Sequence, residues 1–182
     1  ARSQQLGRAA LGSRDRTRHR AFLEGSRMSY WLLKSEPEVF GIDDLAKAKR
    51  KTTHWDGVRN FQARNFMRDQ MRRGDLAFFY HSNCEVPGIA GIVKIVKEGY
   101  PDHTAFDASD PHFDADSDPT KPRWYMVDVQ LQRKFRSVIS LATLREHENR
   151  ALKGLALLQR GNRLPVTPVS AAHWEFILSL AS

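Results

Sequence analysis

The sequence predicts an α+β domain built from a small curved sheet or open barrel with short helices packed outside it. Apolar runs of strand length recur along the chain, and segments with helical periodicity separate them. A chain of 182 residues is long enough for one ordinary domain, with at most a tail in addition. Hydrophobic residues make up 41% and charged residues 27%, a globular composition that excludes collagen-like and wholly disordered chains.

The first part of the domain alternates strand and helix signals. Residues 30–34 form an apolar run that predicts a buried strand, and Pro37 ends it because proline cannot donate to a ladder. Residues 42–46 predict a short helical turn. The short aromatic run at residues 76–81 predicts a strand buried on both faces.

Residues 60–73 between these strands predict an amphipathic helix. Apolar side chains share one face, and Arg64, Arg68 and Arg72 recur every four residues on the other face. Gly74 ends the helix. The arginine stripe is either a phosphate-binding surface or an ordinary solvated helix face.

The second part continues with two strands and three helical segments. Residues 89–96 predict a strand, residues 101–123 a loop rich in aspartate and proline, and residues 124–133 an alternating strand. Residues 140–148 and 152–158 predict helices. Ser170 predicts the N-cap of a closing helix whose apolar face carries Trp174, Ile177 and Leu178.

Residues 1–27 differ in composition from the rest of the chain. They hold seven arginines and two acidic residues, with few apolar side chains, and so predict a disordered basic tail. Three interpretations compete, namely an organelle transit peptide, a phosphate-binding arm and an extension outside the native product with the true start at Met28. We favour the third, because a strand pattern begins directly after Met28, and we expect one domain over residues 28–182.

Net charge and hydropathy limit the classes of partner that the protein can have. The formal net charge of +8 favours polyanionic partners. No apolar run approaches the ~20 residues of a membrane span, so we expect a soluble chain without membrane association.

Signatures of catalysis, metals and cofactors are missing. The single cysteine, Cys84, lies three residues after His81 without an evident third group, so it predicts a small loop residue and not a nucleophile. Residues 114–118 resemble the opening of a calcium loop, but Pro119 and Tyr125 stand where glycine and glutamate are needed. No glycine-rich phosphate loop occurs. We therefore expect a non-catalytic protein without a cofactor or a metal site.

Two tryptophans lie where the core pattern does not require them. Trp55 stands in a loop that leads into the arginine-striped helix, and Trp124 opens its strand on the row opposite the apolar face. Aromatic faces held apart by a scaffold can sandwich a nucleobase, with about 1–3 kcal/mol of stacking per base. The alternative is that each ring fills a small core under a loop. Trp31 and Trp174 are expected in the core.

Several sequence blocks resemble the EVE-domain family, which is similar to the PUA and YTH domains. The main blocks are YWLLKSEP at 30–37, WDGVRNFQARNF at 55–66 and FFYHSN at 78–83, and shorter ones follow at 87–91, 100–102, 122–124 and 127–129. The resemblance runs from Ser29 to the C-terminus and leaves out residues 1–27. It implies a PUA-like small curved β-barrel flanked by short helices, with a concave pocket.

The resemblance also implies a function, namely reading a modified base, most readily a modified cytosine in DNA. Trp55 and Trp124 match the cage tryptophans of YTH readers, and Lys34, Ser35 and Glu36 match a Lys-Ser-Asn motif. Glu36 departs from that motif, and because a carboxylate only accepts hydrogen bonds, it favours a base edge with an amino group. The implied nucleobase-binding set is Lys34, Ser35, Glu36, Trp55, Gly57, Val58, Asn60, Tyr80, His81, Ser82 and Trp124. The implied phosphate-binding set is Arg59, Arg64, Arg68 and Arg72.

Alternatives stay open at this stage. The same pocket could serve a nucleic-acid-modifying enzyme with His81, Glu36 or Asp56 as acid or base, or a sensor of a small nucleotide derivative. RNA could replace DNA. We expect a monomer, with nucleases as possible partner proteins, in the cytoplasm: associated with the nucleoid if the chain is bacterial, and in the nucleus instead if it is eukaryotic.

Overall fold

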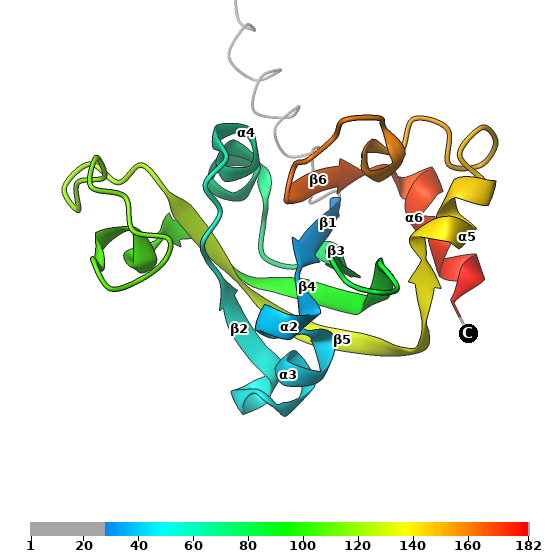
Figure 1. Cartoon of the computed structure of the whole chain (residues 1–182), viewed down its shortest axis with the longest axis horizontal. Helices are drawn as coiled ribbons and strands as arrows, with labels where there is room; N and C mark the ends of the chain where they lie inside the picture. Colours follow the sequence, from blue (N-terminus) through cyan, green and yellow to red (C-terminus); the bar gives the residue numbers. More distant parts are fainter. Residues whose placement is uncertain (1–27, 182) are drawn as a thin grey trace, which may run out of the picture.

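Six strands form one mixed sheet in the order β2–β5–β4–β3–β1–β6 (Figure 1). The computed structural model describes residues 28–181. The strands are β1 (Tyr30–Ser35), β2 (Thr52–Trp55), β3 (Leu76–His81), β4 (Gly88–Pro101), β5 (Tyr125–Ser140) and β6 (Val166–Val169). The α-helices are α2 (Pro37–Phe40), α3 (Ile42–Lys47), α4 (Phe61–Asn65), α5 (Leu141–Glu146) and α6 (Ala171–Leu180). Short helical turns are η1 (Lys49–Lys51), η2 (Phe66–Gln70), η3 (His103–Phe106) and η4 (Ala156–Leu158).

The sheet is strongly curved and remains open. β1 and β3 are parallel, the other neighbouring strands are antiparallel, and β2 and β6 are the two edges. The pairing of β4 with β5 shifts register at four places, and such bulges bend and twist a sheet. The predicted α+β class, a curved sheet with short helices outside, is confirmed.

Two cores lie on the two faces of the sheet. Side chains of the central strands alternate between them, so that Leu33 and Phe79 belong to one core while Leu32 and Phe78 belong to the other. α3, α4 and η2 cover the first core, and α5, η4 and α6 cover the second. The prediction that residues 76–81 form a strand buried on both faces is confirmed. Trp31 and Trp174 are core residues, as expected, at 3% and 2% exposure.

The edge strands escaped the sequence analysis. β2 is short and largely polar, and β6 contains Pro168, which the free side of an edge strand tolerates. Both pair along one side only, so neither needs the apolar run that identifies a central strand. The predicted strands at 89–96 and 124–133 exist and are longer than expected, at 14 and 16 residues.

Two predicted helices differ from the structure. Residues 60–73 form a short α-helix, α4, followed by the π-helical turn η2, and the helical region ends at Met71. Residues 152–158 contain only the turn η4. The N-cap expected at Ser170 is present, and Ser140, where a helix was expected to begin, is the N-cap of α5. Each side chain accepts a backbone N–H of the first helical turn.

The tail predictions for residues 1–27, disorder and a non-native origin, lie outside the described residues. Within residues 28–181 no helix has the length and apolar character needed to cross a membrane.

Candidate functional site

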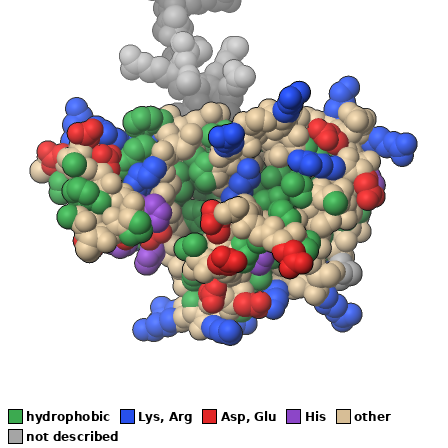
Figure 2. Space-filling model, in the orientation of Figure 1, with side chains coloured by type: hydrophobic (Ala, Val, Ile, Leu, Met, Phe, Trp, Pro, Cys, Tyr) green, Lys and Arg blue, Asp and Glu red, His purple; other side chains and the backbone are tan. Residues whose placement is uncertain are grey.

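A cavity of about 650 Å³ lies where the end of β1, the segment after β2 and the segment before β6 meet. Eight residues of the two implied sets line it: Lys34, Ser35, Glu36, Trp55, Gly57, Val58, Arg59 and Ser82. The parallel pairing of β1 with β3 explains part of this grouping. Both strands end at the same edge, where the Ser82 backbone N–H donates to the Ser35 carbonyl over 2.9 Å. The middle of the face in Figure 2 combines apolar, basic and acidic side chains.

Trp55, the last residue of β2, forms the aromatic wall of the cavity. Its ring packs edge-to-face on Phe79, with centroids 5.3 Å apart, and the residue is 7% exposed. The indole N–H makes no hydrogen bond within residues 28–181. The ring is therefore fixed by the core on one side, while its polar edge can donate to a ligand.

The loop after β2 is held by one buried carboxylate, that of Asp102. One oxygen accepts the Gly57 backbone N–H at 2.9 Å and the Arg59 guanidinium at 2.7 Å. The other accepts the backbone N–H and the hydroxyl of Thr104. Burial alone would raise the pKa of Asp102, but hydrogen bonds from Arg59, Thr104 and Gly57 outweigh it and lower that pKa.

This network corrects two predicted roles. The Gly57 N–H is occupied by Asp102, and the Val58 carbonyl accepts from Arg59, so neither backbone group is available to read a base edge. Arg59 also donates to the His112 carbonyl and to the Thr104 hydroxyl. Its guanidinium thus holds the loop and is not a free phosphate ligand.

Gly57 has a conformation that only glycine adopts without strain. Its φ is +71°, and a Cβ there would lie 2.8 Å from the His112 ring. His112 therefore packs directly against the loop backbone and becomes part of the cavity wall.

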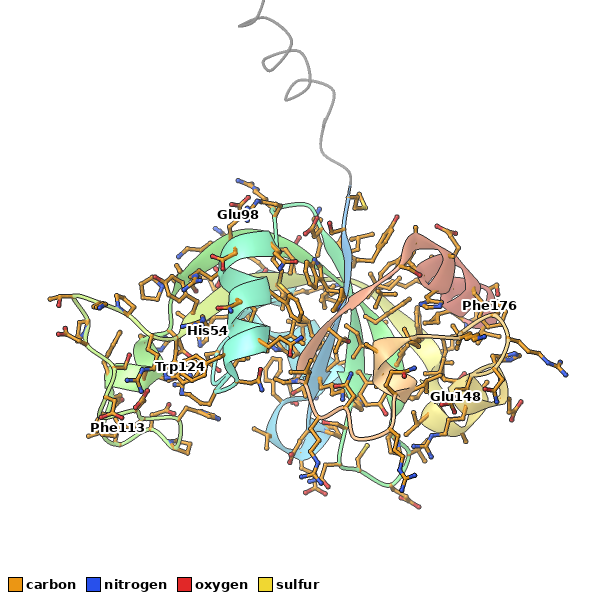
Figure 3. The ribbon with its side chains drawn as sticks, turned by 90° about the horizontal axis from the view of Figure 1, so that it is seen from above. His54, Glu98, Phe113, Trp124, Glu148 and Phe176 are labelled. Carbon is orange, nitrogen blue, oxygen red and sulfur yellow. The ribbon has the colours of Figure 1, made fainter. Side chains whose placement is uncertain are left out.

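Trp124 does not face Trp55 across the cavity, so the predicted two-tryptophan sandwich is wrong. Its ring stacks on Phe61 at 4.9 Å, and the guanidinium carbons of Arg59 and Arg64 lie 5.5 and 6.0 Å from its centroid. The indole N–H donates to Asp114 at 2.5 Å, and only 6% of the residue is exposed. Figure 3 shows Trp124 beside the loop that carries Phe113. The alternative interpretation, a small core under a loop, holds for this ring.

Three other residues of the implied nucleobase set also lie outside the cavity. Asn60 is the N-cap of α4 and accepts the Ala63 N–H. Tyr80 belongs to the core on the opposite face, where burial raises its pKa to about 12. His81 accepts the Ile42 N–H at 3.1 Å, and burial lowers its pKa although Asp43 opposes the shift. Asn60 and His81 thus serve the local fold, while Tyr80 also lines a second hollow next to the cavity.

The arginine stripe is already paired. Arg68 binds Asp69 in a bidentate manner, Arg72 donates to the carbonyls of Asp69 and Met71, and Arg64 donates to Asn65 and to the Arg123 carbonyl. These contacts favour the ordinary helix-face interpretation of the stripe.

A second hollow of about 400 Å³ adjoins the cavity, and Lys34 and Ser82 line both. Arg145 and Arg160 line this second hollow, while Arg163 lines the cavity itself. Within residues 28–181 these three exposed guanidinium groups make no ion pair and no hydrogen bond. Burial lowers the pKa of Lys34, so a nearby anion would favour its charged form.

The two implied sets leave out half of the cavity wall. The residues left out are Val39, Phe40, Thr53, His54, Asp56, His112, Arg163 and Pro165. Asp56 alone among them is a sequence candidate, as the acid or base of the enzyme alternative. Residues near the recognised blocks, such as Val39 and His54, could have been found from those blocks. Nothing in the local sequence points to His112 or Arg163, since each lies in an irregular loop far along the chain from the blocks.

Comparisons with known proteins show the family of the chain. The family model described as EVE domain matches residues 29–180. Thymocyte nuclear protein 1 of Danio rerio is 52% identical over 167 residues, covering 84% of this chain and 71% of that protein.

Solved structures match as well. The human THYN1 protein in complex with 5-methylcytosine-containing DNA superposes with a TM-score of 0.80 at 48% identity, covering 84% of this chain and 96% of that one. A protein from Pseudomonas putida gives a TM-score of 0.79 at 45% identity, covering 83% and 98%. The chain therefore belongs to the EVE-domain family.

Proposed function

We propose that this protein reads a modified cytosine of DNA by taking the base into the cavity, without altering it chemically. The observation that carries the proposal is the cavity itself, which the Trp55 ring and Glu36 both line. Its volume lies in the ~300–1,000 Å³ range of small-ligand sites and admits one nucleoside. The human relative crystallised with 5-methylcytosine-containing DNA supports the choice of ligand.

Recognition of the base edge rests on acceptors. Glu36 is exposed, and its carboxylate makes no hydrogen bond within residues 28–181; Asp56 adds a second carboxylate to the wall. The Ser35 hydroxyl donates to the Phe40 carbonyl over 2.7 Å, which leaves its lone pairs free to accept. Such a wall suits the N4 amino group of cytosine. Trp55 supplies the stacking surface for the flipped base, whose extrusion from the helix costs a few kcal/mol.

The flanking phosphates are assigned to different arginines from those first expected. A guanidinium that already holds a carboxylate must give up that contact before it binds phosphate, whereas an unpaired one need not. Arg145, Arg160 and Arg163 are unpaired in the described part of the chain and border the two adjoining hollows. We assign the DNA backbone to this surface.

The base-binding test is a fluorescence anisotropy titration of the full chain with one oligonucleotide, with and without 5-methylcytosine. Trp55→Ala should weaken binding of the modified strand by about 5- to 150-fold, the equivalent of about 1–3 kcal/mol of stacking. Phe61→Ala is the matched control, because Phe61 is an exposed aromatic residue outside the cavity. A larger loss with Phe61→Ala than with Trp55→Ala would move the base to the Phe61–Trp124 stack and overturn the proposal.

The phosphate assignment is tested by the salt dependence of the same titration. Arg163→Ala should reduce the slope of log K against log salt by about one unit, and Arg68→Ala should leave it unchanged. The reverse pattern would return the phosphates to the arginine stripe.

Further experiments distinguish this proposal from RNA binding, from a small-molecule sensor and from an enzyme. An RNA strand of the same sequence tests the preference for DNA, and a free modified nucleoside tests the sensor hypothesis, which demands binding that is insensitive to salt. Mass analysis of the recovered oligonucleotide tests for an enzyme. The Danio rerio relative is named thymocyte nuclear protein 1, and this favours the nucleus over the cytoplasm. A monomeric state and nuclease partners stay predictions from the resemblance.

A further inference from the structure

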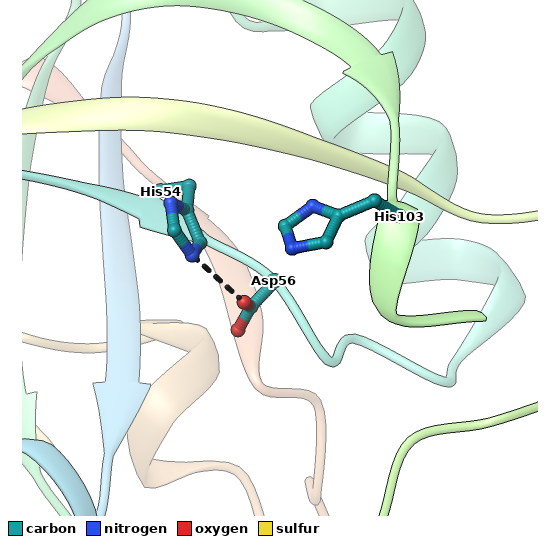
Figure 4. A group of neighbouring side chains, drawn as sticks. All are labelled: His54, Asp56 and His103. Carbon is teal, nitrogen blue, oxygen red and sulfur yellow. Dashed lines mark ion pairs between the residues drawn. The ribbon is translucent and has the colours of Figure 1, made fainter. Parts of the chain in front are cut away.

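A group of three side chains at the rim of the cavity has the donor set of a transition-metal site. His54, Asp56 and His103 each offer one ligand atom, and these atoms lie within 4.8 Å of one another (Figure 4). We infer that this group binds a Zn²⁺-class ion through two imidazole nitrogens and one carboxylate oxygen.

The separations are close to those that a metal requires. Four-coordinate zinc holds nitrogen and oxygen ligands at about 2.0–2.2 Å, which places neighbouring ligand atoms about 3.3–3.5 Å apart. His54 Nε2 and Asp56 Oδ2 are already 3.2 Å apart. The His103 ring lies edge-on to His54 with centroids 5.3 Å apart, and its exposed side chain can close the remaining gap by rotation.

The three side chains have no competing partners. Apart from the His54–Asp56 pair, none forms a side-chain hydrogen bond with any group in residues 28–181. His54 and Asp56 are separated by one residue at the end of an edge strand, so their side chains leave the strand on the same side.

The backbone that carries the ligands is braced by the Asp102 network. Asp102 directly precedes His103, and its carboxylate accepts the N–H of Gly57, which directly follows Asp56. One partly buried hydrogen bond thus ties the two ligand-bearing segments together. Such preorganisation is what a metal site needs from the structure around its ligands.

The chemistry selects the class of ion. Imidazole nitrogen suits zinc and its neighbours in the transition series, whereas Mg²⁺ and Ca²⁺ prefer sites built from oxygen alone. Three protein ligands leave a fourth position for water or a ligand. Since His54 and Asp56 also line the cavity, the bound ion lies at its rim.

The test is a Zn²⁺ titration of the full chain without an affinity tag, in competition with a chromophoric chelator. One equivalent should bind, and His103→Ala and His54→Ala should each weaken it by more than about tenfold. His147→Ala is the control, a histidine on the opposite side of the sheet that contacts Phe176 and has no place in the group. Co²⁺ gives a second readout, because visible bands of low-symmetry coordination should appear with the wild type and fade in both variants.

Far-ultraviolet circular dichroism should show that each variant is folded, because both histidines are exposed. Unchanged Zn²⁺ affinity in both variants, or displacement of Zn²⁺ by equimolar Mg²⁺, would overturn the inference. Neither result depends on DNA binding, so failure here leaves the proposed function untouched.

Discussion

Replacing Asp102 by asparagine should destabilise the fold by about 3–5 kcal/mol. The carboxylate is fully buried and accepts four hydrogen bonds, from Gly57, Arg59 and twice from Thr104. An asparagine has one acceptor oxygen, so at least one buried N–H would face an amide NH₂, at a cost of about 1–3 kcal/mol. The side chain of Arg59, 22% exposed, would also lose its counter-ion. Removing one partner of a buried pair typically costs about 3–5 kcal/mol in total.

Guanidinium chloride unfolding at pH 7, followed by circular dichroism and tryptophan fluorescence, measures this difference. Asp107→Asn is the matched control, because Asp107 makes the same pair of contacts to the residue two positions on, Ser109, but is exposed and has no arginine partner within residues 28–181. The control should lose less than about 1 kcal/mol. If Asp102→Asn lost no more than Asp107→Asn, the idea that Asp102 holds the site loop would be wrong.

The same carboxylate gives the effect a pH dependence of known sign. The folded-state pKa of Asp102 is lowered below its unfolded value, because the hydrogen bonds it accepts outweigh its burial. Its contribution is therefore fully present above the unfolded pKa and is lost as the pH falls through the folded pKa. The stability gap between wild type and Asp102→Asn should narrow in acid, and a gap that widened would contradict this.

Three further substitutions test the loop after β2, the buried Trp124 ring and the N-cap of α6. Gly57→Ala should lower the free energy of unfolding by about 1–2 kcal/mol because φ is positive, and by more because the new Cβ meets the His112 ring; it should also weaken DNA binding. Gly154→Ala is the control, since Gly154 also has a positive φ but open space around it. Equal unfolding midpoints of the two variants would exclude the clash. Trp124→Ala should lose about 3–5 kcal/mol in chemical unfolding, because it removes a buried ring, and near wild-type stability would show that the ring is dispensable. Ser170→Ala should lose about 1 kcal/mol through the N-cap of α6, measured as a lower thermal midpoint, and Ser170→Thr should restore most of it.

Local sequence patterns were enough to predict most of the central strands and the closing helix. The strand at residues 76–81, the long strands that follow it and the N-cap at Ser170 are visible in runs of ten residues or fewer, because side-chain alternation and capping involve near neighbours. The recognised blocks also pointed to the end of β1 and the loop after β2, and both segments line the cavity. The edge strands escaped, since a strand paired on one side needs no apolar run.

The positions of Trp55 and Trp124 follow only partly from the local sequence. The sequence determined that each ring would lie at a junction between loop and strand, outside the regular core pattern. The chain fold decided that Trp55 borders the cavity while Trp124 is covered by Phe61, Arg59 and Arg64.

The pairing of the charged side chains also depends on the tertiary structure. Composition shows how many arginines there are, but not that Arg68 is paired and Arg163 unpaired within residues 28–181, nor that His103 comes to lie beside His54. The physical reason is the sequence separation of the residues that interact. Hydrophobic periodicity depends on neighbours within one helical turn or a few strand residues. Whether a polar group finds a hydrogen-bond partner, or a ring is exposed, depends on contacts between segments 40 or more residues apart, such as that of Arg59 with Asp102.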